Sequence, residues 1–235
     1  FLDGAQRYRM LETLREFGLE RMAERGEVVE QRRRHAAQFA ALVREASPHT
    51  RRAEQLEWMA RLEAERDNIL AALRFLCDDG QAQAALELAL DMATYWTVTG
   101  RHADASSWLE LALQAPGRTD PGTRLGAEAL HAISLVASNM NATPDAISAS
   151  LQKLRTIGRQ LSRVKMPADS MLALLRPIVA MFSDEPPELV DRLVDEGLTS
   201  TDPWIVATLR MFRAGMAENN GDVVTMRTNA ESALT

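Results

Sequence analysis

Helix-breaking residues recur in this sequence at nearly constant intervals, and that spacing restricts the fold more than any other feature. Breaks between helical segments fall near residues 100, 142, 184 and 221, which gives intervals of 42, 42 and 37 residues. Arrays of helix pairs have periods of ~34 to 47 residues, because one pair cannot bury its apolar face alone and stacks on its neighbours. We therefore expect an all-α fold, a right-handed α-solenoid of helix pairs with about 11 helices.

Apolar periodicity locates the individual helices. It predicts three long helices at about 8–22, 27–46 and 54–77, which end at Gly26, at Ser47-Pro48 and at Asp78-Asp79-Gly80. Paired helices follow at 81–99, 103–115, 123–140, 144–161, 168–182 and 187–198, and two more begin at Asp202-Pro203 and at Asp222. Thr143 is the expected cap of the helix at 144–161, and Pro177 should kink the helix at 168–182. The first helix carries Leu11, Leu14, Phe17 and Met22 on one face, which we expect to pack on the helices that follow.

The composition agrees with a helical protein. Aromatic residues make up 5% of the chain, and strong helix formers dominate over the residues that strands favour. The formal net charge is −6, but residues 1–52 carry +3 and residues 53–235 carry −9. An acidic balance opposes general attraction to nucleic acid phosphates.

The cysteine count and the hydropathy suggest a cytoplasmic protein. Cys77 is the only cysteine, so neither an intramolecular disulfide nor a thiolate zinc cluster can form within this sequence. No apolar run reaches the ~18 residues that a membrane span needs, and the first residues do not follow a signal-peptide pattern. The sequence starts without Met, which we interpret as a fragment boundary.

The clearest repeat unit covers residues 86–116. Ala93 and Trp96 on its first helix, Gly100 in its turn and Leu109 on its second helix follow the alternation of small and large residues in a tetratricopeptide unit. Tyr95, Trp96 and Trp204 are most simply core or groove-lining residues. Because first helices of such pairs line the concave groove, these three are the candidates for contact with a protein partner or a small-molecule effector. The units after residue 116 follow the tetratricopeptide pattern less closely. The last one resembles half a unit, so we expect the repeats to continue beyond residue 235.

Motifs for catalysis and cofactor binding are missing from the sequence. It contains no P-loop, no GxSxG, no HExxH and no CxxC, so we expect no catalytic, cofactor-binding or metal-binding residues in this stretch. His35, His49, His102 and His131 lie on four different predicted segments, which disfavours a metal site. Cys77 is expected to be a small buried residue. Glu63 with Asp67, and the run Arg32–His35, are expected to be solvated or salt-linked helix faces.

Several segments together resemble a known family. These are "YRMLETLREFG", "RHAAQFAAL" and "LEWMARLEAERDNILAAL", in this order and before the helix pairs. They are similar to the stretch after the ATPase core in actinobacterial transcriptional regulators of the signal-transduction ATPase class, including LuxR-type and antibiotic-regulatory-type proteins. The resemblance covers about residues 7–116 through these motifs and the rest through architecture. Arg66 stands where the family often has His.

The resemblance implies a place for the chain in a larger protein. In that family an effector, often DNA-binding, precedes a nucleotide-binding domain and a winged helix, and the repeats act as sensor and oligomerisation arm. It therefore implies that ATP or ADP binds upstream of Phe1, that the parent protein is an ATPase, and that DNA is contacted only through another domain. Met10, Leu11 and Glu12 stand where related ATPases have a Met-His-Asp motif.

On this basis three domains are expected: residues 1–26 as the end of a winged helix, 27–80 as a helical connector, and 81–235 as tetratricopeptide-like repeats. The predicted function is that of a non-enzymatic sensor and protein-interaction module, with self-association through the repeats as a further expectation. The alternatives are a stand-alone helical-repeat scaffold for protein partners, nucleic-acid binding through the Arg-rich N-terminal helices, and an enzyme whose scattered site carries no motif.

Overall fold

Glycines with left-handed backbone angles separate the helices in a computed structural model of the chain, which describes residues 10–139, 143–161, 171–182 and 185–234. Gly26, Gly80, Gly100 and Gly221 have φ angles of 69°, 73°, 69° and 75°, a conformation that L side chains rarely adopt. Each lies directly after a helix, so the predicted breaks near 100 and 221 are confirmed. The predicted breaks at Asn141 and at Ser183-Asp184 lie outside the described residues.

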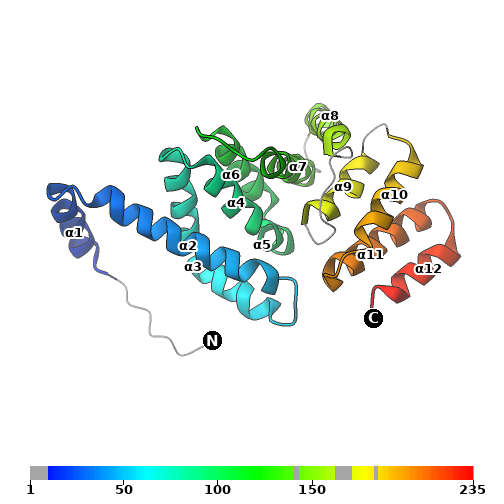
Figure 1. Ribbon diagram of the computed structural model, residues 1–235, viewed down its shortest axis with the longest axis horizontal. Coiled ribbons are helices and arrows are strands. Elements are labelled where there is room, and N and C mark those ends of the chain that lie inside the picture. Colours follow the sequence, from blue (N-terminus) through cyan, green and yellow to red (C-terminus); the bar gives the residue numbers. More distant parts are fainter. Residues whose placement is uncertain (1–9, 140–142, 162–170, 183–184, 235) are drawn as a thin grey trace. The chain divides into compact units, whose positions relative to one another are not determined.

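The described residues form twelve α-helices and no strands, in agreement with an all-α helical-repeat fold (Figure 1). The helices of the N-terminal part are α1 (Glu12–Glu24), α2 (Val28–His49), α3 (Gln55–Asp78), α4 (Ala82–Asp91), α5 (Ala93–Val98) and α6 (His102–Gln114). Those of the C-terminal part are α7 (Pro121–Ser138), α8 (Pro144–Leu161), α9 (Met171–Met181), α10 (Pro187–Gly197), α11 (Pro203–Asn219) and α12 (Val223–Ser232). The handedness of the solenoid stays a prediction.

Two predicted boundaries were wrong. The helix expected at 81–99 is divided at Met92, whose ψ of −5° departs from the helical value, so there is one helix more than expected. The helix expected to end before Ser47-Pro48 continues to His49, because the Pro48 nitrogen falls in the last turn and the following backbone N–H groups bond to carbonyls of that turn. His35 and His49 therefore lie on the same helix, α2. The predicted start of α9 at 168 lies outside the described residues.

Side-chain caps begin three helices of the C-terminal part. Asp120, Asp202 and Asp222 accept hydrogen bonds from the backbone N–H groups of Thr123, Trp204 and Thr225, at 2.8, 3.0 and 3.0 Å. These bonds satisfy N–H groups that a helix leaves unpaired in its first turn. The predicted starts at Asp202-Pro203 and Asp222 are confirmed, and so is the position of Pro177 inside α9.

The chain divides into two compact units, while the expected division into three domains stays a prediction. The first contains residues 1–99 and 111–119, and the second contains residues 100–110 and 120–235. In the first unit α2 packs on α3, and both pack on α4. Its core takes small and aliphatic side chains from all three helices: Ala36, Val43, Ala46, Leu62, Ile69, Leu73, Leu76, Ala85, Leu86 and Ala89. The expected connector at 27–80 thus shares one core with the helix that follows it.

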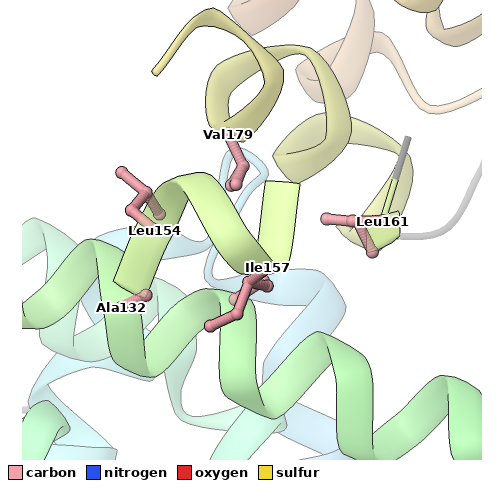
Figure 2. Packing of buried hydrophobic residues seen from close by; sticks show 6 residues of the cluster. Ala132, Leu154, Ile157, Leu161 and Val179 are labelled. Carbon is pink, nitrogen blue, oxygen red and sulfur yellow. The ribbon is translucent and has the colours of Figure 1, made fainter. Parts of the chain in front are cut away.

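The second unit contains the last three of the predicted pairs, whereas the predicted pair at 81–99 and 103–115 is divided between the two units. α7 packs on α8, α9 on α10 and α11 on α12, while α8 and α7 also contact α9. Figure 2 shows one core cluster, in which Leu154, Ile157 and Leu161 of α8 lie with Ala132 of α7 and Val179 of α9. A second cluster joins α9, α10 and α11 through Leu174, Val194, Ile205 and Leu209. Each pair buries its apolar face against the next, as helical repeats do.

Candidate functional site

Tyr95 and Trp96, two of the three predicted contact residues, are buried in the first unit. They lie on α5 with exposed fractions of 1% and 2%. The Tyr95 hydroxyl donates a hydrogen bond to the Glu63 carboxylate on α3, which satisfies its only polar group. A ligand could reach either ring only by displacing core packing. Contact between these residues and a ligand stays a prediction.

Trp204, the third candidate, lies in the first turn of α11 and is half-buried. Its ring packs on the cluster of Leu174, Val194, Ile205 and Leu209 in the second unit. Because Trp204 belongs to the second unit and Tyr95 and Trp96 to the first, each group has to be considered separately. Trp204 is the candidate whose side chain keeps some accessibility.

The first helix does not pack as expected. Met10 and Leu11, which directly precede α1, and Leu14 and Phe17 on α1 are 57% to 69% exposed, and we call these four residues the α1 stripe. Leu19 and Met22 are half-buried, so Met22 is the one residue of the predicted face that is partly covered. The contact is small, because α1 meets α2 at only its C-terminal end. The prediction that Leu11, Leu14 and Phe17 pack on the following helices was wrong for the described residues.

An aromatic stack closes the turn between α2 and α3. The rings of His49 and Trp58 are stacked, 4.9 Å apart and 9° from parallel, and the Arg61 guanidinium lies 4.8 Å from the centre of the Trp58 ring. His49 Nδ1 is also 3.8 Å from a carboxylate oxygen of Glu54. Stacking and cation–π contact are worth about 1 kcal/mol each at partly exposed positions. The chain's own side chains therefore already engage Trp58.

Arginines of the basic run are paired with carboxylates. Arg34 lies 3.0 Å from Glu30, and Arg33 lies 3.4 Å from Glu30 and 3.3 Å from Asp79. Hydrogen bonds from Gln81 and Arg33 lower the pKa of Asp79, so this carboxylate stays charged. The pairing fits the expected salt-linked helix face. It lowers the positive charge that nucleic-acid binding through this run would need.

The carboxylates Glu63 and Asp67 also fit a salt-linked face. Both lie near Arg66, at 3.6 and 3.3 Å, and their carboxylates raise its pKa. Cys77 is buried, and that burial, with the charge of Asp78 beside it, raises the pKa of its thiol to about 11. Such a thiol stays protonated at neutral pH, as a small buried residue does. Within the described ranges no group of three or more His, Cys, Asp or Glu residues could hold a metal ion.

A lysine and a histidine meet between α7 and α8 of the second unit. Lys153 Nζ lies 3.2 Å from Nδ1 of His131, which is 3% exposed. Burial, and then the Lys153 charge, lower the pKa of His131, whereas the charge of Glu110 acts in the opposite direction. Sequence reasoning placed the two residues on separate helices but had no reason to bring them together, because they are 22 residues apart and share no motif.

Comparison with known proteins gives a distant likeness. Over 112 residues, 48% of the chain, the sequence is 30% identical to proteins from Mycobacterium bovis and Mycobacterium tuberculosis that are named as HTH-type transcriptional regulators. The match spans 12% of the length of these relatives. No protein-family model matches the chain, and no solved structure matches it.

The likeness agrees with the coarse part of the predicted function. The matching proteins are named as regulators of transcription rather than as enzymes. In the described part of the chain no helix is long and apolar enough to cross a membrane. The subclass of regulator and the nucleotide that the predicted parent binds remain proposals.

Proposed function

We propose that this chain is a non-enzymatic sensor and protein-interaction arm of a larger transcriptional regulator, which controls nucleotide-binding and DNA-binding parts that precede it. The observation that carries the proposal is the 30% identity over 112 residues to much longer HTH-type transcriptional regulators. The array of helix pairs supports it, because stacked pairs present extended surfaces on which partners bind. The motifs quoted above favour the signal-transduction ATPase class, including its LuxR-type members, with ATP or ADP bound upstream of Phe1.

The α1 stripe is the proposed joint between the arm and the preceding parts. A 13-residue helix with little contact to its neighbours is marginal in water, so α1 needs a surface that covers it. Its exposed stripe of Met10, Leu11, Leu14 and Phe17 is the apolar surface that such a contact would bury. The repeats would then bind a protein partner or a small-molecule effector, and α1 would transmit the resulting conformational change to the preceding parts.

The proposal can be tested with two strains of the source organism. One lacks the whole gene, and the other carries an in-frame deletion of the codons for residues 28–235. A restraining arm predicts that the two strains change transcription of the same genes in different directions, because arm removal leaves an unrestrained regulator. An arm-deleted strain with the transcript profile of wild type, or two strains without transcriptional change, would contradict the proposal.

A single charge on the stripe should reproduce the effect of removing the arm. Phe17→Glu places a carboxylate on the proposed contact, where burial of an unpaired charge is unfavourable by several kcal/mol. We expect the transcript profile of this variant to follow that of the arm-deleted strain. RNA sequencing measures the profile, and circular dichroism of the purified chain should show unchanged helicity, because Phe17 is 57% exposed.

Ala23→Glu is the matched control for this variant. Ala23 is exposed and lies on the opposite side of α1. Its substitution by Glu therefore adds the same charge to the same helix, but away from the stripe. This variant should behave as wild type. Equal profiles for Phe17→Glu and Ala23→Glu would remove the stripe from the proposal.

A further inference from the structure

The contact between Lys153 and His131 combines an accessible amine with a shielded base. Lys153 on α8 is exposed, whereas His131 on α7 is 3% exposed. The 3.2 Å between Nζ and Nδ1 is within the reach over which a side chain can take a proton from an attacking nucleophile. Lys153 and Lys165 are the only lysines in the sequence, so few side-chain amines compete for reaction.

The hydrogen-bonding roles in this pair follow from the chemistry of the two groups. A lysine ammonium has donors only, so Nδ1 of His131 must be the acceptor and its proton is on Nε2. Burial and the neighbouring ammonium lower the pKa of His131, which keeps the ring neutral and Nδ1 available as a base. Nε2 is buried and has no hydrogen-bond partner among the described residues.

Glu110 supplies the charge that a protonated ring would need. It lies on α6, in the part of that helix that belongs to the second unit, and its charge favours the protonated form of His131. An amine with a base within hydrogen-bonding reach is the part of a nucleophile-activating arrangement that this contact supplies, and the Glu110 charge adds to it at a distance. Here the three groups come from α8, α7 and α6.

We propose that Lys153 is an acylation site that reacts with small acyl donors, acyl phosphates or acyl thioesters, with His131 as the general base. The Lys153 ammonium first loses one proton to water, and the neutral Nζ then attacks the carbonyl carbon of the donor and forms a C–N bond, while the bond from that carbon to the phosphate oxygen or thioester sulfur breaks. The Nζ proton passes to His131 Nδ1 and then to the departing phosphate or thiolate. The products are an amide on Lys153 and free phosphate or thiol.

Acylation would change the exposed charge of α8. Lys153, Arg155 and Arg159 are its exposed cations, and an amide on Lys153 removes one of the three charges. The amide N–H can still donate to Nδ1, so the contact between α7 and α8 persists while the surface charge falls. The inference concerns chemistry within the second unit and does not depend on the proposed regulatory function.

The test measures acetylation of the purified chain by mass spectrometry. The protein is incubated with acetyl phosphate in one arm and acetyl-CoA in the other, and the rate at Lys153 is divided by the rate at Lys165 in the same molecules. The ratio should fall about tenfold in His131→Asn, which removes the base; general bases in enzymes contribute more than this. Reaction at Lys153 with either donor supports the proposal and identifies the donor class, and reaction with neither overturns it.

Control variants separate the base from a general structural effect. His35→Asn replaces a histidine of the first unit and should leave the ratio as in wild type. Circular dichroism must show that His131→Asn is folded; an unchanged ratio in the folded variant overturns the proposal. If His131→Asn does not fold, Glu110→Gln decides, because loss of this exposed carboxylate weakens the base and should lower the ratio about two- to threefold. A ratio equal to that of wild type in Glu110→Gln would then overturn it.

Discussion

Leu154→Ala should lower the free energy of unfolding of the second unit by about 2–5 kcal/mol. Leu154 is 1% exposed and lies in the cluster between α7, α8 and α9 (Figure 2). Truncation removes apolar contacts and leaves a cavity that the surrounding helices fill only in part. Urea unfolding followed by circular dichroism measures the loss as a lower midpoint at unchanged slope.

Gln152→Ala is the control for this change. Gln152 is exposed and lies on the same helix, so its truncation should alter stability by no more than about 0.5 kcal/mol. If both variants unfolded at the same urea concentration, α8 would not be packed through Leu154. The predicted acylation of Lys153 would then also need another explanation, since Lys153 is adjacent to Leu154 on α8 and its contact with His131 depends on the same packing of α8 on α7.

Gly117→Ala should destabilise the first unit by about 3 kcal/mol, from a strained backbone and a steric clash together. Gly117 has a φ of 133°, and a Cβ built there would lie 2.6 Å from the carbonyl oxygen of Gly80 and 3.3 Å from Cβ of Ala82. The obstructing atoms belong to backbone and a short side chain, so they cannot rotate away. Thermal unfolding of the purified variant should show the loss.

Gly26→Ala separates the two causes. Gly26 has a φ of 69°, but a Cβ there would meet nothing within 4 Å. It should therefore show only the conformational penalty, about 1 kcal/mol. Equal losses for Gly26→Ala and Gly117→Ala would mean that the turn at 117 does not lie against the start of α4.

Features decided by one or two neighbouring residues could be predicted from the sequence. Gly80 and Gly221 end helices because glycine takes a left-handed angle without strain, and Asp202 with Pro203 begins one through a cap and a fixed φ. Such local signals recur at the repeat period, which is why the all-α helix-pair fold could be predicted. The turns with this chemistry were located to within a residue or two.

Features decided by packing could not be predicted in the same way. The break at Met92 involves neither Gly nor Pro, and the apolar pattern runs on through it from α4 to α5. The pattern of α1 indicates an apolar face but not whether the chain itself covers it, and Leu14 and Phe17 remain exposed. Periodicity alone does not distinguish a side chain that is buried in its own domain from one that only a binding partner would cover.

The same limit applies to the candidate sites. Sequence patterns left open whether Tyr95 lies in the core or lines the groove. Its ring is buried in the first unit, and the Glu63 carboxylate that makes this burial tolerable lies 32 residues earlier. Lys153 and His131 come together only because α7 and α8 fold back on each other. Contacts of this range depend on how neighbouring helices are rotated, which single-sequence patterns do not specify.

The buried thiol has a practical consequence for spectroscopy. Because Cys77 is the only cysteine and its pKa of about 11 keeps it protonated, maleimide or methanethiosulfonate reagents at neutral pH would leave the native chain unlabelled. Cysteines introduced at exposed Glu57 of the first unit and exposed Gln152 of the second would then be the reactive pair. The protein thus needs no cysteine-free background for spin labels or fluorophores, and electron–electron resonance or energy transfer could follow the separation of its two units as effectors are added.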